Sequence, residues 1–234
     1  MAYVRLIAIT RPVCATCGWE FSGLCSAHQQ PEDAEDFIAY VARVSNPTNQ
    51  NNQQTAPKLL KYLIEHKHWS PFELASFTVE IKTSRAIAQQ ILRHRSFSFQ
   101  EFSQRYTKAT EFEIYPARRQ DVKNRQNSID DLEPGIKEWF ECAQHEIQGY
   151  GQARYEEALS RGIAKEQARF LLPLSTATTL YMSGTVRSWI HYIQLRADVA
   201  TQLEHRQIAE EIKMIFCEQF PNTGNALDWW KDIV

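Results

Sequence analysis

A basic and aromatic segment, RHRSFSFQEFSQRY at residues 93–106, holds the densest group of side chains that could do chemistry. In it an Arg-His-Arg triplet is followed, within ten residues, by a serine and a further arginine. The stretch from Lys82 to Arg119 carries a local net charge of +5, whereas the whole chain has a formal charge of −2. Because the planar guanidinium matches the oxygens of a phosphate in a bidentate way, this pattern is typical of an anion site.

The same residues also have a simpler interpretation. A helix that ends at Arg93, His94 and Arg95 would place cations at its carboxyl end, where the helix dipole favours them. The interleaved phenylalanines and Tyr106 favour a partly desolvated site for an anion or a ring instead. Charge alone leaves both interpretations open.

A second polar group lies in TVRSWIHYIQLRAD, residues 185–198. At 100° per residue, Arg187, His191 and Gln194 share one face of a helix, and Arg196 lies on the opposite face. One helix would thus offer polar groups to two different neighbours. The alternative is that all four are exposed while the apolar residues between them face the core.

Two further segments could form sites. In HWSPFE, residues 68–73, a histidine and a carboxylate bracket a proline turn, and they would form either a cap and an ion pair or the wall of a pocket. Four soft ligands could hold a tetrahedral zinc ion; these are Cys14, Cys17, Cys25 and His28. The seven residues between the two pairs are fewer than in familiar zinc sites, so an insertion with reduced thiols, near residues 12–30, is the favoured interpretation.

Composition sets the class of protein. The 234 residues are 43% hydrophobic and 23% charged, which predicts a globular chain, taken as one domain over residues 1–234. The weak net charge argues against a surface built to coat nucleic acid. The seventeen uncharged residues between Arg169 and Arg187 are too few for a membrane span, and the first residues lack the long apolar run of a signal peptide. We expect a cytoplasmic protein without a disulfide framework.

Several familiar motifs are absent from the sequence. It has no G-x-G-x-x-G, no P-loop and no H-E-x-x-H. Cys142 and Cys217 lie inside helical patterns without a dedicated base, which argues against a thiolate nucleophile.

Periodicity predicts the elements that must position these residues. The alternation of apolar residues indicates strands at 3–9 and 75–82, and helical spacing indicates several helices. The helices are expected at 32–44, 58–66, 84–94, 134–161, 184–196 and 200–219, with a short one that carries Arg169 and ends before Pro173. Residues 174–183 are compatible with either a strand or a loop, and 119–133 with a loop. The pattern predicts an α+β fold in which helices outnumber strands.

The triplet Arg-His-Arg, with seven residues and then a serine after it, resembles the signature of the flavin-dependent thymidylate synthases. HWSPFE is similar to the family's His-x-Ser/Thr-Pro-Phe-Glu segment. ARVSNP (42–47), Gln90, Arg169 before Leu-Pro and the segment from Arg187 to Glu204 follow in the family's order. The resemblance spans about residues 35–220.

This resemblance implies a fold like that of the thymidylate synthase complementing proteins, a mixed or antiparallel sheet flanked by a larger helical layer. It implies a homotetramer with active sites between subunits. The implied reaction makes dTMP from dUMP, with 5,10-methylenetetrahydrofolate as carbon donor and NADPH-reduced FAD as hydride source. It needs no cysteine nucleophile and no nucleic-acid partner.

The resemblance also assigns residues by motif. The positions implied for dUMP are Gln90, Arg93, Glu101, Ser103, Gln104, Arg105, Arg169 and Arg196. The positions implied for FAD are Ser45, Ser70, Glu73, Arg93, His94, Arg95, Arg187 and His191. Those implied for the catalytic centre are Arg196, His68 and Ser103. Ser103 and Arg105 would hold the phosphate, and Arg196 would stabilise negative charge that develops on the uracil.

Three positions depart from the family's pattern: Ala200 in place of a histidine, Thr185 in place of an asparagine, and Gln104 in place of a small residue. The first two bear on flavin affinity, and the third could crowd the phosphate site. Two other functions are compatible with the basic segment. One is a phosphate-ester hydrolase that uses the arginines, and the other is a single-stranded nucleic-acid module in which Phe97, Phe99 and Phe102 stack on bases.

Overall fold

A computed structural model describes residues 3–13, 31–108 and 111–232 of the chain. Within them an antiparallel sheet has the strand order β1-β2-β6-β3. The strands are β1 (Tyr3–Ile9), β2 (Ser76–Ser84), β6 (Ala177–Thr185) and β3 (Ser98–Glu101). β4 (Arg119–Gln120) and β5 (Ser128–Ile129) form a separate small hairpin.

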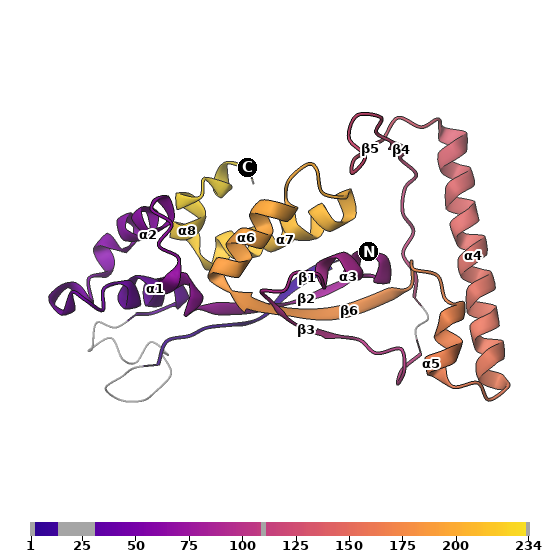
Figure 1. Ribbon diagram of the computed structural model, residues 1–234, viewed down its shortest axis with the longest axis horizontal. Helices are drawn as coiled ribbons and strands as arrows, with labels where there is room; N and C mark the ends of the chain where they lie inside the picture. The colour runs from indigo at the N-terminus through magenta and orange to yellow at the C-terminus, as the bar shows by residue number, and fades with distance from the viewer. Residues whose placement is uncertain (1–2, 14–30, 109–110, 233–234) are drawn as a thin grey trace.

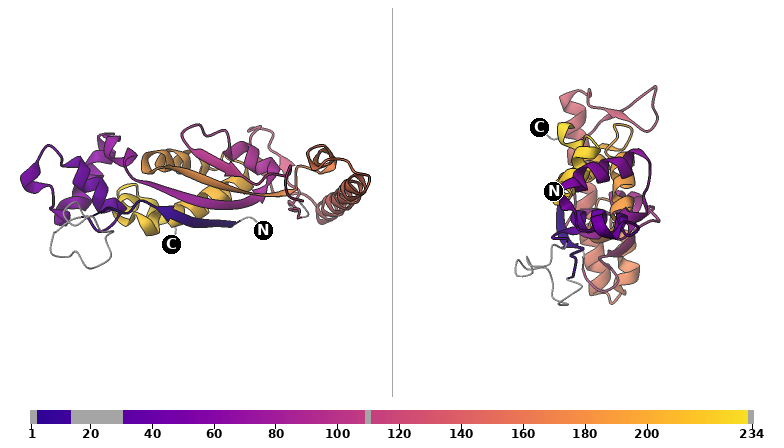
Figure 2. Two further views of the ribbon diagram at one scale, coloured as in Figure 1. Left: turned by 90° about the horizontal axis from the view of Figure 1, so that it is seen from below. Right: turned by 90° about the vertical axis from the view of Figure 1, so that its left-hand side faces the viewer.

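Helices α3, α6 and α7 lie on one side of this sheet, α1 and α2 lie beyond one end of it, and α4 stands crosswise beyond the other (Figure 1). The two further views show the same elongated arrangement (Figure 2). The helices are α1 (Ala34–Ala42), α2 (Ala56–Glu65), α3 (Arg85–Ile91), α4 (Pro134–Ser160), α5 (Lys165–Ala168), α6 (Val186–Arg196), α7 (Leu203–Gln219) and α8 (Pro221–Ala226). The predicted α+β class with an antiparallel sheet and a larger helical layer is confirmed.

The alternation along β2 decides which face of the sheet is covered. Phe77, Val79 and Ile81 are buried beneath the helices, as their period of two predicts. Trp189 of α6 stacks on Phe77 with ring centroids 4.4 Å apart, and its indole N–H donates to the Phe77 carbonyl. This apolar layer fixes α6 against the sheet.

The opposite face of the sheet is polar. At its centre Glu80 of β2 accepts hydrogen bonds from Tyr181 (2.6 Å), Arg5 (2.9 Å) and Tyr3 (3.1 Å) on the neighbouring strands. The Tyr181 hydroxyl is the main cause that holds the pKa of Glu80 below its usual range. Side chains on this face therefore bond across the strands instead of contributing to the apolar core.

Two helices follow their strands directly. α3 begins one residue after β2, and α6 begins one residue after β6. The register pairs Ser84 with Ala177 and Ser76 with Thr185, so the two strands end at opposite ends of the sheet. Each helix then runs back over the sheet, and their carboxyl ends meet above it. The register thus brings the segment after α3 to the end of α6.

Caps differ between these two helices. The hydroxyl of Thr185 accepts a hydrogen bond from the Ser188 N–H and caps α6. Ser84 stands directly before α3 but makes no side-chain capping bond. Its hydroxyl is hydrogen-bonded to the Tyr115 hydroxyl instead.

Most predicted boundaries agree with the structure within a few residues. α4 begins at Pro134 as predicted, and Gly162 follows it with a φ of 84°, in the left-handed region that glycine tolerates best. Residues 174–183, left open by the sequence, contribute most of β6. The segment 119–133 contains the β4–β5 hairpin, and α8 has no counterpart among the predicted elements.

Within residues 3–13, 31–108 and 111–232, no helix has both the length and the apolar character to cross a membrane. The proposed zinc ligands Cys14, Cys17, Cys25 and His28 lie outside the described residues.

Candidate active site

A cavity of about 440 Å³ lies where α6 faces the 3-10 helix Ser70–Glu73. It is lined by Trp69, Glu73, Ser96, Arg187, Ser188, Ile190, His191 and Gln194. The sequence prediction that Arg187, His191 and Gln194 share one helix face is confirmed. Arg187 forms an ion pair with Glu73 across the cavity wall. The cavity therefore combines a cation, an imidazole and two apolar side chains.

The end of α6 presents its other polar side chain to a different neighbour, as the helical period predicts. The Nε–H of Arg196 donates a hydrogen bond of 2.9 Å to Nε2 of His94. His94 accepts only as a neutral imidazole with its proton on Nδ1. Burial, and then the positive charge of Arg196, lowers the pKa of His94 to about 4. At neutral pH this imidazole thus holds Arg196 through Nε and leaves both Nη groups outside the bond.

Buried polar side chains support His94 from within the core. The ring of His94 meets the ring of Tyr192 edge-on at 4.8 Å, and the Tyr192 hydroxyl lies 3.1 Å from Nε2 of His205. Nδ1 of His205 lies 3.4 Å from Oε1 of Gln90 on α3. His205 is fully buried, and burial with the charge of Arg196 lowers its pKa to about 3.

His205 has no role among the sequence predictions. One signal was present: in α7 it shares the apolar face of Ile208, Ala209, Ile212 and Phe216, all of them buried. A histidine on such a face needs partners from other elements. Those partners come from α3 and α6, and only the tertiary structure identifies them.

A second group of predicted residues gathers around Glu166 of α5. Nε of Arg105 lies 3.4 Å from the Glu166 carboxylate, and Nε of Arg169 donates to the Glu166 carbonyl at 3.1 Å. The Ser103 hydroxyl accepts a hydrogen bond from the Arg105 N–H at 3.4 Å. Three residues expected to bind dUMP, two of them at its phosphate, therefore lie together.

The neighbours of this group are engaged with the sheet. Glu101, at the end of β3, accepts a hydrogen bond from Thr178 at 2.9 Å and lies 3.5 Å from Arg85. Gln104 is only 4% exposed. Its side chain is thus in the interior. Its Nε2 has no hydrogen-bond partner among the described residues.

Other predicted residues lie apart from both groups. Ser45 and Ser70 are exposed and do not line the cavity. His68 is exposed, with its ring edge-on to that of Tyr62 at 5.9 Å. Arg93 and Arg95 are exposed on either side of His94. In one chain the arginines of the predicted dUMP site thus fall into separate groups, at His94 and at Glu166.

The described part of the chain contains no group of three or more His, Cys, Asp or Glu side chains that could hold a metal ion. Cys142 is exposed on α4. Burial raises the pKa of the Cys217 thiol to about 11, which keeps it protonated.

The chain matches a known protein family. The model of the thymidylate synthase complementing proteins matches residues 27–222. The chain belongs to this family. A flavin-dependent thymidylate synthase of Synechocystis sp. is 53% identical over 226 residues, which cover 97% of this chain and 99% of the relative. A probable flavin-dependent thymidylate synthase of Paramecium bursaria Chlorella virus 1 is 51% identical over 226 residues, which cover 96% of this chain and 98% of the relative.

The fold of the thymidylate synthase complementing proteins is also found in a solved relative. The crystal structure of a UMP/dUMP methylase from Streptomyces cacaoi, bound with 5-Br dUMP, superposes with a TM-score of 0.79. It is 23% identical, and the match covers 97% of this chain and 95% of that one. At this identity the likeness supports the fold.

Proposed function

We propose that this family member makes dTMP from dUMP by reductive methylation. The carbon comes from 5,10-methylenetetrahydrofolate and the reducing equivalents from NADPH through FAD. The observation that carries the proposal is the Arg196–His94 pair, which holds a guanidinium on the face of α6 opposite the cavity of Arg187 and His191. The names of the two relatives above half identity support the same activity.

The cavity fits a flavin nucleotide in its chemistry. The Arg187 guanidinium and the His191 imidazole suit phosphate oxygens, and Trp69 and Ile190 suit an aromatic ring system. When bound, FAD would supply the hydride. Further contacts are proposed from Ser45, Ser70, Glu73, Arg93, His94 and Arg95.

The second group suits the nucleotide. Ser103, Arg105 and Arg169 would hold the phosphate of dUMP, because two guanidinium groups and a hydroxyl lie together there. Gln90, Arg93, Glu101 and Gln104 are proposed as further nucleotide contacts.

Arg196 is proposed to face the uracil. Its two free Nη groups would stabilise negative charge on the ring while His94 fixes their direction. His68 and Ser103 are proposed to complete the catalytic centre, His68 beside the flavin and folate.

Two groups that lie apart in one chain suggest that more than one chain builds each site. We propose a homotetramer in which Arg105 and Arg169 of one copy meet Arg196 of another. A cytoplasmic location, small-molecule partners and a single domain over residues 1–234 belong to the same proposal.

Absorbance and turnover test the function. The purified protein should show flavin bands near ~375 and ~450 nm. With methylenetetrahydrofolate present, its NADPH oxidation should depend on dUMP, and dTMP should form. A colourless protein that does not take up added FAD would contradict the proposal, and so would flavin-bound protein that forms no dTMP.

A further inference from the structure

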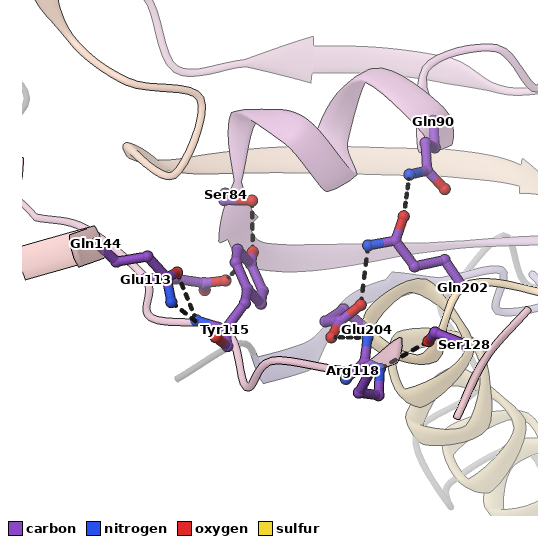
Figure 3. Close-up of polar contacts among 9 residues, drawn as sticks. All are labelled: Ser84, Gln90, Glu113, Tyr115, Arg118, Ser128, Gln144, Gln202 and Glu204. Carbon is purple, nitrogen blue, oxygen red and sulfur yellow. Dashed lines mark hydrogen bonds and ion pairs between the residues drawn. The ribbon is translucent and has the colours of Figure 1, made fainter. Parts of the chain in front are cut away.

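A continuous line of hydrogen bonds runs from the buried side of α6 to the segment before β4, with its Gln90–Gln202 link at the surface, and Figure 3 shows its greater part. We call this line the relay. Its members are, in order, Tyr192, His205, Gln90, Gln202, Glu204 and Arg118. The last three links measure 2.7 Å from Gln90 to Gln202, 2.9 Å from Gln202 to Glu204, and 2.5 Å from Arg118 to Glu204.

The relay has a fixed direction because one member can only accept. The Glu204 carboxylate is about nine-tenths buried and forms an ion pair with Arg118. Burial pushes the pKa of Glu204 upward, but the hydrogen bonds from Arg118 and Gln202 outweigh this and hold it below the usual value. An ionised carboxylate offers only lone pairs, so Gln202 must donate to it through Nε2.

The direction of the hydrogen bond at Glu204 also determines which atoms donate and accept at Gln90 and His205. The Gln202 amide directs Nε2 at Glu204 and Oε1 at Gln90, and because Oε1 can only accept, Gln90 must donate through Nε2. Oε1 of Gln90 is left facing His205, which must donate through Nδ1. Nε2 of His205 is then the acceptor for the Tyr192 hydroxyl. The low pKa of His205, about 3, keeps this imidazole neutral, so only one of its two ring nitrogens carries a proton.

The segment that carries Arg118 is anchored to the same helix as Gln90. The Arg118 Nε–H donates to the Ser128 hydroxyl at 2.8 Å. The Tyr115 hydroxyl donates to the Glu113 carboxylate and is hydrogen-bonded to Ser84, the residue before α3, and Gln144 of α4 bonds both backbone groups of Tyr115 (Figure 3). The segment before β4 is therefore tied to Ser84 at the start of α3 and, through Glu204 and Gln202, to Gln90 on the same helix.

We propose that Glu204 is a positioning residue that fixes which way the amide of Gln90 points at the nucleotide site. One Nε2 hydrogen and one Oε1 lone pair of Gln90 remain for dUMP, in an arrangement that the relay determines. The part of this inference that concerns dUMP rests on the proposed function. The part that concerns the direction of the relay does not.

A pair of variants tests this directly. In Glu204→Gln the new amide can accept from Arg118 and donate to Gln202, so every link can reverse and the His205 proton can move to Nε2. Adding Gln202→Glu moves the acceptor-only carboxylate one link along. In that double variant Gln90 must again donate through Nε2, and the original direction returns. A role in packing alone would give no such rescue.

Histidine-labelled protein without ligand gives the first measurement. The ¹⁵N shifts of His205, assigned with His205→Phe, report which ring nitrogen carries the proton. We expect the proton on Nδ1 in the wild type and in the double variant, and substantial population of the Nε2 form in Glu204→Gln. Glu210→Gln is the matched control, because Glu210 lies on α7 and pairs with Arg206 outside the relay.

Titration with dUMP gives the second measurement. We expect Glu204→Gln to weaken dUMP binding about tenfold, with FAD binding unchanged, KM for dUMP raised and kcat retained. We expect the double variant to recover most of the loss. A wild-type proton on Nε2, an unchanged His205 in Glu204→Gln, or a double variant no better than the single one would overturn the inference. Wild-type protein with the expected proton on Nδ1 that fails to bind dUMP would contradict the proposed function and leave the direction of the relay supported.

Discussion

Arg196 and His94 lie 102 positions apart in the chain, and the Nε–H of the arginine donates to the Nε2 lone pair of the imidazole over 2.9 Å. A protonated His94 would have no lone pair to offer and would place a second cation against the guanidinium. The pair therefore ties the direction of Arg196 to the protonation state of His94.

Arg196→Ala should reduce dTMP formation about 100- to 1000-fold, because it removes a preorganised donor from the uracil site. FAD should stay bound, since the cavity lies on the other face of α6. Turnover and flavin absorbance, measured on one preparation, check both statements. Arg161→Ala, an exposed residue at the end of α4, is the control. Wild-type turnover in Arg196→Ala would show that the uracil contact is misplaced.

The stability of the protein should fall as the pH drops from 7 to 5, in part because of His205. Its pKa in the folded protein, about 3, lies well below the ordinary value of 6.5. Below pH 6.5 the unfolded chain therefore takes up a proton that the folded protein refuses. From this residue alone the free energy of unfolding should drop by about 2 kcal/mol between pH 7 and pH 5.

His205→Gln tests this contribution, because an amide can donate and accept but does not titrate. Urea unfolding at both pH values should show a loss about 2 kcal/mol smaller in the variant than in the wild type. Equal losses in the two proteins would mean that His205 already carries its proton, or gains it easily, in the folded state.

Gly184→Ala should destabilise the protein by about 1–3 kcal/mol, since a methyl group there would overlap the ring of Phe97. Phe97 packs against Trp189 and His94, so the displacement would also disturb the His94–Arg196 pair. Gly149→Ala is the matched control. Nothing lies within 4 Å of the added methyl in α4, and stability should rise by about 0.5–1 kcal/mol. A melting point of Gly184→Ala equal to that of the wild type would refute the overlap.

Replacing both described cysteines should leave the reaction intact. Cys142→Ser changes an exposed residue and should be neutral. Cys217→Ala removes a buried thiol that packs near Gly224 and should cost about 1 kcal/mol of stability. Measured kcat in the folded double variant checks the statement, and loss of turnover would point to thiolate chemistry.

The sequence predicts features that depend on a local period. The alternation of Phe77, Val79 and Ile81 identified the buried face of β2, and the helical period separated Arg196 from Arg187 and His191. Both follow from backbone geometry within one element, so no tertiary information is needed.

The sequence did not predict the contacts between elements. The meeting of His94 with Arg196 depends on the register of β2 against β6, and that of Arg105 with Arg169 depends on how α5 docks. The partners of His205 come from α3 and α6 and carry no pattern of their own. Motif resemblance named several of these residues but said nothing of how they bond to one another.

The absence of a connecting loop between β2 and α3, or between β6 and α6, has a practical consequence. A residue inserted at Ser84/Arg85 or at Thr185/Val186 would rotate everything after it by one helical step and carry His94 or Arg196 out of reach of the other. The turn between β4 and β5 has no such constraint, because its residues are exposed and bond mostly among themselves. A label, tag or crosslinking handle is best introduced there.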